Sequence, residues 1–438
     1  MTRVESDGMA ALQAVDFQWT VHVDSVWSDP EYHVPALHSA IRDEILYELE
    51  DMATRKSSGS SLGRVVTGAG GVGKTHLIRT LRMDAAARGA GFVFVDMTGV
   101  QDFWSTILQS YLDSLQRPYI DGIPQYAHLL EHLIDAIIEG KPVGRGKLKL
   151  IIDGVPQYAR LFEFLINAIV GKPVGREELR YMATAGAGKA VQMISAFLSR
   201  LTRRHRHEVL KYQDTIRALF LLRSDDLTIL NIGYSWLQGS GIEQKDKERY
   251  GFEDIRKEPQ EIVEALSWLM ALKSPVILAL DQMDSIVAQH HLVARAGVGE
   301  PDLDEQMLSL SIIEGIGGGL SALRDVTSRT LVVVSCLEST WEIIRETLST
   351  NADRYNEPVP LKKLGRNELA MEMVIQRLCD AYRKSGFRPE YASWPYKPEA
   401  FGVTGGMLPR QILQNCERHR RRCLARGEVM ECETLDMS

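Results

Sequence analysis

Hydrophobic residues along this chain recur with two different spacings, which together predict an α/β fold. Short, nearly continuous apolar runs occur at residues 64–67, 91–96, 275–281 and 330–335. Runs of this kind are typical of parallel strands that helices cover on both faces. Apolar positions recur at helical spacing in residues 34–52, 75–88 and 369–383. We therefore expect a three-layer parallel sheet followed by a helical domain.

The order of these elements divides the chain into three parts. We expect an N-terminal segment with a lead-in helix (1–60), a sheet-containing core (61–345) with a helical insertion at about 105–255, and a C-terminal helical domain with a tail (346–438). Inside the insertion, residues 121–145 recur as residues 153–176. Two copies are fewer than a solenoid normally needs, so we interpret them as a tandem duplication.

Charge and cysteine content exclude several classes of protein. The formal net charge is −7, so a nucleic-acid contact would require a local basic patch. The five cysteines are odd in number and form no CxxC pair, which indicates reduced thiols and a cytoplasmic location. The N-terminus does not resemble a secretory leader, and no window is apolar enough to predict a membrane span.

One glycine-rich segment carries the strongest indication of chemistry. It reads Gly68-Ala-Gly-Gly-Val-Gly-Lys74-Thr75 and stands between an expected strand and an expected helix, as a P-loop does. The glycines allow backbone N–H groups to surround phosphate oxygens, and the helix N-terminus adds partial positive charge. Lys74 would bridge the β- and γ-phosphates of ATP, and the Thr75 hydroxyl would bind Mg²⁺. The expected nucleotide-binding residues of this loop are Gly68, Ala69, Gly70, Gly71, Val72, Gly73, Lys74, Thr75 and His76.

A second glycine-rich segment, residues 183–190, is similar to this loop but differs in three respects. It lacks the first glycine and the final Ser or Thr, and it follows a charged helical segment instead of a strand. We interpret it as a helix break.

Magnesium binding also requires a carboxylate at the end of a neighbouring strand. Asp281 ends one apolar run, and Asp153 ends the segment Lys-Leu-Lys-Leu-Ile-Ile-Asp. We prefer Asp281, because a further strand, an arginine and a helical domain follow it. Asp153 is the alternative, since it lies closer in sequence to the P-loop, although it falls inside the duplicated unit.

With these residues the sequence resembles the AAA+ and STAND branch of P-loop ATPases, and most closely the origin-recognition-like initiator group. The resemblance covers about residues 35–425 apart from the insertion. It implies that Ser335, at the end of residues 330–335, senses bound nucleotide, and that Arg410 in Gly-Gly-Met-Leu-Pro-Arg is a second sensor on a lid helix. It also implies that Arg354 is an arginine finger, which would serve a neighbouring subunit of a homo-oligomer. A solvated turn is the alternative for Arg354.

The chain departs from this family at the position beside the strand carboxylate. Gln282 stands where such enzymes usually have a glutamate that activates water, and an amide cannot accept the proton. Asp284 is then the nearest candidate base. It can equally be an acid that satisfies backbone amides at a helix N-terminus.

The last expected helix carries a basic stripe, whose members are Arg418, Arg420, Arg421, Arg422 and Arg426. The stripe is either a DNA contact or a solvated helix face.

Two functions follow from these residues. The first is an ATP-dependent switch with slow hydrolysis to ADP and phosphate, which changes how the protein meets a partner, in a DNA-linked process such as loading, defence or remodelling. The second is a scaffold that binds nucleotide with little turnover and holds a protein partner. A small-molecule kinase is disfavoured, because the sequence offers no evident acceptor pocket.

Overall fold

The computed structural model describes most of the chain. Its described residues are 3–20, 23–54, 62–100, 102–139, 186–222, 224, 226–284, 287, 288, 290, 303–348 and 355–435. The second duplicated copy, Asp153 and Arg354 lie outside these residues. In the described part of the chain, no helix combines the length and the hydropathy that a bilayer crossing requires.

The centre of the structure is a five-stranded parallel sheet with the strand order β2-β5-β6-β1-β7. The strands are Leu62–Thr67 (β1), Gly91–Asp96 (β2), Val276–Asp281 (β5), Thr330–Cys336 (β6) and Val359–Pro360 (β7). Every residue of β5 and β6 is buried, as in strands covered on both faces. The register pairs Leu280 with Val334 and Val66 with Ser335, so three central strands end at one edge. The expected parallel α/β fold is confirmed.

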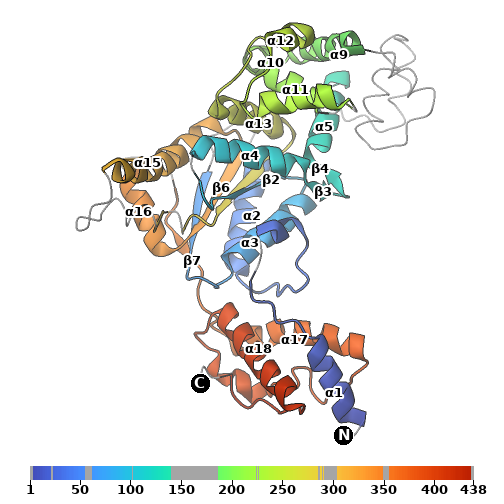
Figure 1. The fold of residues 1–438 in the computed structure, drawn as a ribbon, viewed down its shortest axis with the longest axis vertical. Coiled ribbons are helices and arrows are strands. Elements are labelled where there is room, and N and C mark those ends of the chain that lie inside the picture. Colours follow the sequence, from blue (N-terminus) through green and yellow to red (C-terminus); the bar gives the residue numbers. More distant parts are fainter. Residues whose placement is uncertain are drawn as a thin grey trace, which may run out of the picture.

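Helices cover both faces of this sheet (Figure 1). One face packs on Val23–Trp27 (η1), Ser39–Thr54 (α2) and Lys74–Ala87 (α3). The other packs on Phe103–Gln116 (α4), Pro259–Lys273 (α13), Leu303–Val326 (α15) and Glu338–Leu348 (α16). Alternate residues of β5 face the two layers: Ile277 and Ala279 contact the first, and Leu278 and Leu280 contact the second.

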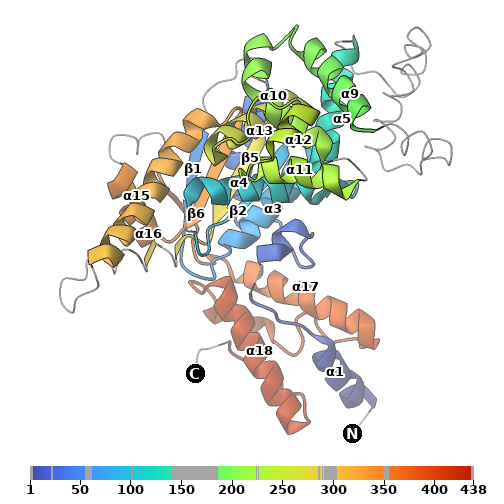
Figure 2. The same cartoon turned by 45° about the horizontal axis from the view of Figure 1, so that its top comes forward.

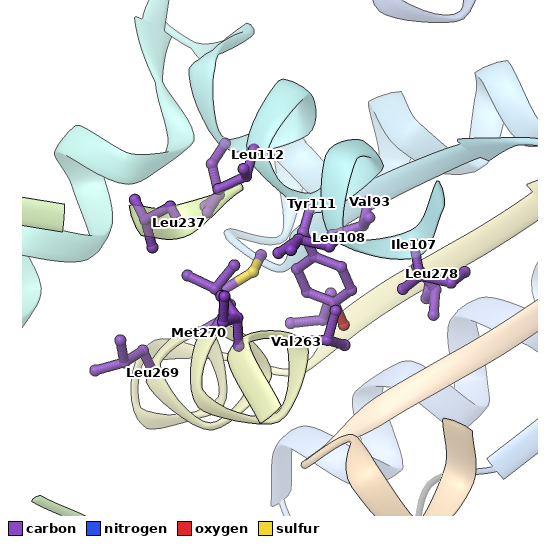
Figure 3. Packing of buried hydrophobic residues seen from close by; sticks show 14 of the residues in the cluster. Val93, Ile107, Leu108, Tyr111, Leu112, Leu237, Val263, Leu269, Met270 and Leu278 are labelled. Carbon is purple, nitrogen blue, oxygen red and sulfur yellow. The ribbon is translucent and has the colours of Figure 1, made fainter. Parts of the chain in front are cut away.

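The expected insertion, at about 105–255, includes most of α4, which covers the sheet; after α4 the described part continues with a short hairpin that the apolar pattern does not predict, followed by helices. Its elements after α4 are Pro118–Ile120 (β3), Ile123–Pro124 (β4), Gln125–Glu139 (α5), Gly186–Leu201 (α9), Arg206–Leu221 (α10), Leu227–Leu237 (α11) and Gln244–Tyr250 (α12). Figure 3 shows Tyr111 and Leu112 of α4 beside Leu237 of α11 and Met270 of α13. The insertion therefore continues the hydrophobic core of the sheet.

The C-terminal helical domain consists of Asn367–Ser385 (α17), Pro398–Val403 (η3) and Pro409–Arg426 (α18). Helix α1 (Arg3–Ala14), at the opposite end of the sequence, packs against α17 and α18 (Figures 1 and 2). Ala11, Val15 and Phe17 belong to the same buried cluster as the helices of this domain. The N-terminal segment thus crosses from the C-terminal domain to the sheet.

Two expectations about local structure differ from the observed elements. The lead-in helix begins at Ser39 and not at Val34, because Val34 is buried in the C-terminal domain's cluster and His38 has a left-handed φ of 57°. The described part of the second glycine-rich segment, Gly186–Ala190, forms the first turns of α9. These described residues are helical, and residues 183–185 lie outside the described part of the chain.

Arg420 of the basic stripe, on α18, forms hydrogen bonds with the C-terminal end of α1. Its Nε donates to the carbonyl of Leu12 at 2.7 Å, and its Nη2 donates to that of Gln13 at 3.1 Å. Its Nη1 donates to the buried carboxylate of Glu417, as does Nε of Arg421 at 2.7 Å. Since helix C-terminal carbonyls have no partner within their own helix, Arg420 satisfies groups that α1 leaves open.

Replacing Arg420 with Ala is expected to destabilise the protein by about 1–3 kcal/mol, because the change removes charge-assisted hydrogen bonds to partly buried acceptors. Arg418→Ala, an exposed arginine on the same helix, should change stability by less than about 0.5 kcal/mol. Denaturant unfolding measures both. Equal effects in the two variants would contradict the anchoring role of Arg420.

Candidate nucleotide-binding site

The glycine-rich loop joins β1 to α3 and wraps around the N-terminus of that helix. Gly71 and Gly73 have left-handed φ angles of 87° and 111°, which residues with a side chain rarely adopt. A Cβ at Gly71 would lie 2.7 Å from the Cβ of Arg410. Glycine at this position therefore also permits the C-terminal domain to approach the loop.

The loop is positioned against the ends of β5 and β6. The Thr75 hydroxyl donates to Oδ2 of Asp281 at 2.6 Å, and the Ser335 hydroxyl donates to Oδ1 of the same carboxylate at 2.9 Å. Lys74 donates through Nζ to the carbonyl of Gly68 at 2.7 Å. The sheet order thus brings Thr75, Asp281 and Ser335 together from distant parts of the sequence.

Asp281 is almost fully buried. Burial raises the pKa of its carboxyl above the usual value, while hydrogen bonds from Thr75, Ser335 and the Gln282 backbone act in the opposite direction. The next residue, Gln282, has a left-handed φ of 67°. Strained backbone of this kind at the mouth of a cavity is common at functional sites.

Asp284 lies beside the lysine. Its Oδ2 is 3.7 Å from Nζ of Lys74, and its Oδ1 accepts a hydrogen bond from the backbone of Leu337 at 2.6 Å. The amide that it satisfies belongs to the turn after β6, and the other oxygen faces the lysine. Asp284 is therefore held in place while keeping one oxygen toward the site.

A cavity of about 380 Å³ opens between the loop and the C-terminal domain. From the sheet side it is lined by Lys74, Thr75, Asp281, Gln282 and Asp284. From the C-terminal domain it is lined by residues of α17 and by Pro409, Arg410 and Leu413 of α18. The backbone N–H of Arg410 donates to the Gly71 carbonyl at 3.3 Å, so α18 begins directly against the loop.

The cavity also contains an arginine that the sequence motifs did not indicate. Arg377 of α17 lines the cavity and stacks on the ring of Tyr32, at 4.8 Å from the ring centroid. Its Nη1 donates to the Met373 carbonyl at 2.8 Å. Its buried Nε has no hydrogen-bond partner, and within the described residues no carboxylate forms an ion pair with it. Burial lowers the pKa of Arg377, so this side of the cavity favours an anion.

The stretch before α2 connects the loop helix to the C-terminal domain. Arg79 of α3 donates to the carbonyls of Ser28 and Asp29 at 2.8 and 2.6 Å. Gln376 of α17 donates to the carbonyl of His33 at 2.7 Å. Residues 28–38 therefore touch both sides of the cavity, a contact that local sequence patterns could not reveal.

Three histidines gather behind the loop. His76 Nε2 lies 3.3 Å from His33 Nδ1, and His38 Nε2 lies 2.8 Å from the carbonyl of Val72. Burial lowers the pKa of His76 to about 3, and it also lowers the pKa values of His33 and His38. These rings are neutral near pH 7, so Lys74, Arg377 and Arg410 supply the positive charge that lines this cavity.

Some of the expected site residues line the cavity, and others do not. The lining includes Gly70, Gly71, Gly73, Lys74, Thr75, His76, Asp281, Gln282, Asp284 and Arg410. The lining does not include Gly68, Ala69 or Val72, or Ser335, which contacts Asp281 from the β6 side. Arg354 lies outside the described residues, as does the alternative carboxylate Asp153.

The pair formed by Thr75 and Asp281 fits a magnesium ion. A hydroxyl and a carboxylate are hard oxygen ligands of the kind that Mg²⁺ prefers. Both residues line the cavity beside Lys74, where the phosphates of a nucleotide would supply further oxygens.

Comparisons with known proteins add little to this geometry. The chain matches no protein-family model and no curated protein. The structure of the Aeropyrum pernix ORC2 protein in its ADP form is similar at a TM-score of 0.40 and 11% identity, over 94% of this chain and 70% of that chain. A likeness at this level establishes neither a shared fold nor a shared function.

Arg377→Met is expected to leave the protein without nucleotide as stable as the wild type or more so, because it removes a partly buried charge that forms no ion pair with another described residue. The same change should weaken ATP and ADP binding by roughly ten- to a hundredfold, since a hydrogen bond to a charged group contributes about 1.5–3 kcal/mol. Thermal melting with and without nucleotide measures both effects. A less stable ligand-free protein with unchanged affinity would show that Arg377 has a structural role only.

Proposed function

We propose that this protein is a P-loop ATPase that binds ATP with Mg²⁺ between its sheet and its C-terminal helical domain, and uses the bound nucleotide as a switch. The observation that carries the proposal is the shared cavity. Lys74 and the Thr75–Asp281 pair line it from the sheet side, and Arg377 and Arg410 line it from the C-terminal domain. An anion bound there contacts both parts at once.

The lining of the cavity suits both the phosphates and the base of a nucleotide. The P-loop end carries the backbone amides of a helix N-terminus and Lys74, which suit the phosphates. The lining also includes apolar side chains, which suit a base: Trp19, Val34, Leu37, Met373 and Leu413. Thr75 and Asp281 would hold the magnesium ion, which neutralises phosphate charge when bound.

Hydrolysis requires a water molecule that attacks the γ-phosphorus while the bond to the ADP oxygen breaks. Gln282 can orient this water through its amide, and Asp284 is the nearest group of the site that can accept the proton. One oxygen of Asp284 faces Lys74 at 3.7 Å. A phosphate that draws Lys74 away would release this oxygen.

The switch follows from the position of α18. Arg410 begins this helix against the P-loop, and its side chain lines the cavity. Its interaction with a phosphate group differs between ATP and ADP, so the preferred position of the C-terminal domain differs too. In this proposal Arg410 and Arg377 make the helical domain a lid.

The central test is Lys74→Ala. It should abolish ATP binding and phosphate release, because it removes the cation between the β- and γ-phosphates. Lys397→Ala, which alters only surface ion pairs in the C-terminal domain, is the matched control and should behave as wild type. Calorimetric titration with ATP gives the affinities. Unchanged ATP affinity in the Lys74 variant would overturn the proposal.

A second function has one observation in its favour. Gln282 stands beside Asp281 where a proton-accepting carboxylate is expected, which favours a nucleotide-bound scaffold with little turnover. The two functions differ in whether phosphate release occurs and depends on Lys74.

Gln282→Glu is expected to raise the rate of ATP hydrolysis by roughly tenfold or more, since general bases contribute about 10²–10⁴-fold. Asp281→Ala should abolish the dependence of turnover on Mg²⁺. Steady-state phosphate release measures both. If Asp153→Ala is the change that abolishes Mg²⁺ dependence, Asp281 is the wrong ligand.

A further inference from the structure

The turn between α9 and α10 is a strongly basic segment of the described chain outside the cavity. Residues 199–207 read Ser-Arg-Leu-Thr-Arg-Arg-His-Arg-His, with four arginines, two histidines and no carboxylate. We call these nine residues the basic turn. Its charge contrasts with the chain's net charge of −7.

The basic turn is held firmly on the core. Leu201 within the turn and Val209 just after it are buried. The His205 ring packs edge-on against Trp268 of α13 at 5.7 Å between centroids. Both helices that flank the turn contribute to the main hydrophobic cluster. The arginines therefore project from a rigid platform.

Three of the four arginines of this turn have no side-chain partner among the described residues. Arg200, Arg203 and Arg206 are exposed, and none of them forms an ion pair or a side-chain hydrogen bond with another described residue. Lys211, one turn further along α10, shows the ordinary alternative, since its Nζ lies 2.6 Å from Glu264. The charges of these three arginines are thus left available to a binding partner.

Helix stability does not account for these residues. Arg206 and His207 occupy the first turn of α10, and His205 provides no side-chain cap. The positive end of a helix dipole disfavours a cation at that place by a few tenths of a kcal/mol. Contact with a partner outside the chain would account for these charges.

The basic stripe of α18 is a weaker candidate for the same role. Arg420 and Arg421 both donate to Glu417, and Arg420 also binds the end of α1. Only Arg418 and Arg422 remain exposed without such a contact among the residues described here, since Arg426 donates to Met430. The basic turn is therefore a better candidate for a nucleic-acid contact than the stripe of α18.

We propose that the basic turn binds the phosphate backbone of duplex nucleic acid. Arginine forms paired hydrogen bonds with phosphate oxygens, and several arginines on one rigid turn match a row of phosphates. A single strand is the poorer fit, because it is bound mainly by exposed aromatic side chains. The aromatic residues nearest in sequence, Phe197 and Tyr212, are buried.

This surface lies far from the proposed lid. Figures 1 and 2 place α9 and α10 at the opposite end of the molecule from α17 and α18. Binding to the turn therefore does not require the nucleotide cavity, and Lys74→Ala should leave it intact. The inference and the proposed ATPase function can fail separately.

The experiment measures binding of a short, fluorescently labelled DNA duplex by anisotropy over a range of salt concentrations. The double variant Arg203→Glu, Arg206→Glu should bind at least roughly tenfold more weakly at low salt. Its log–log salt slope should be shallower by about 2, since each phosphate contact contributes about 0.9. Arg418→Glu, Arg422→Glu on α18 carries the same change in charge and should remain within about twofold of wild type. Thermal melting and ATP binding verify that both variants fold.

A charge-conserving variant separates electrostatic binding from a structural effect. Arg203→Lys, Arg206→Lys should retain most of the affinity and the salt slope. An RNA duplex of the same sequence should bind similarly, because both present a phosphate backbone. No duplex binding by the wild-type protein, equal losses in the two reversal variants, or binding to anionic phosphatidylserine vesicles in place of duplexes would each overturn the proposal.

Discussion

A buried carboxylate requires hydrogen-bond donors, and the donors to Asp281 determine which segments of the chain must come together at the site. Its donors are Thr75, 206 residues away, and Ser335, 54 residues away. They come from the loop after β1 and from β6, the strand that lies between β1 and β5. The order of the strands and the chemistry of the site therefore depend on each other. A different sheet order would leave the buried carboxylate without partners, at a cost of several kcal/mol.

The sequence predicts those parts of the structure that short-range patterns determine. Four apolar runs predict four of the five strands, and the glycine-rich loop stands where its spacing indicates. β7 was not predicted, because it comprises only Val359 and Pro360, and two residues are too few to show a periodic pattern of apolar positions. The helix before β1 was placed five residues early, because Val34 and Leu37 have helical spacing but pack on the C-terminal domain.

Two roles that the sequence did not indicate, those of Arg377 and Arg420, depend on contacts between distant segments. Arg377 lies on the inner face of an ordinary amphipathic helix, and only the position of Tyr32 shows that it lines the cavity. Likewise, Arg420 has the same sequence environment as Arg421 and Arg422. Its role follows from α1, more than 400 residues earlier. Charge patterns reveal where cations lie along the chain, and only the fold reveals which of them are neutralised.

The path of the N-terminal segment constrains how the C-terminal domain can move. That domain is joined to the sheet at two places: by the chain that leaves α1 and passes the cavity, and by the chain that leaves β7 and enters α17. A body attached at one point can swing in any direction, whereas a body attached at two points turns mainly about the line between them. Rigid-body closure of this kind has one principal rotation axis. For the lid proposed above, this geometry favours a single path of opening.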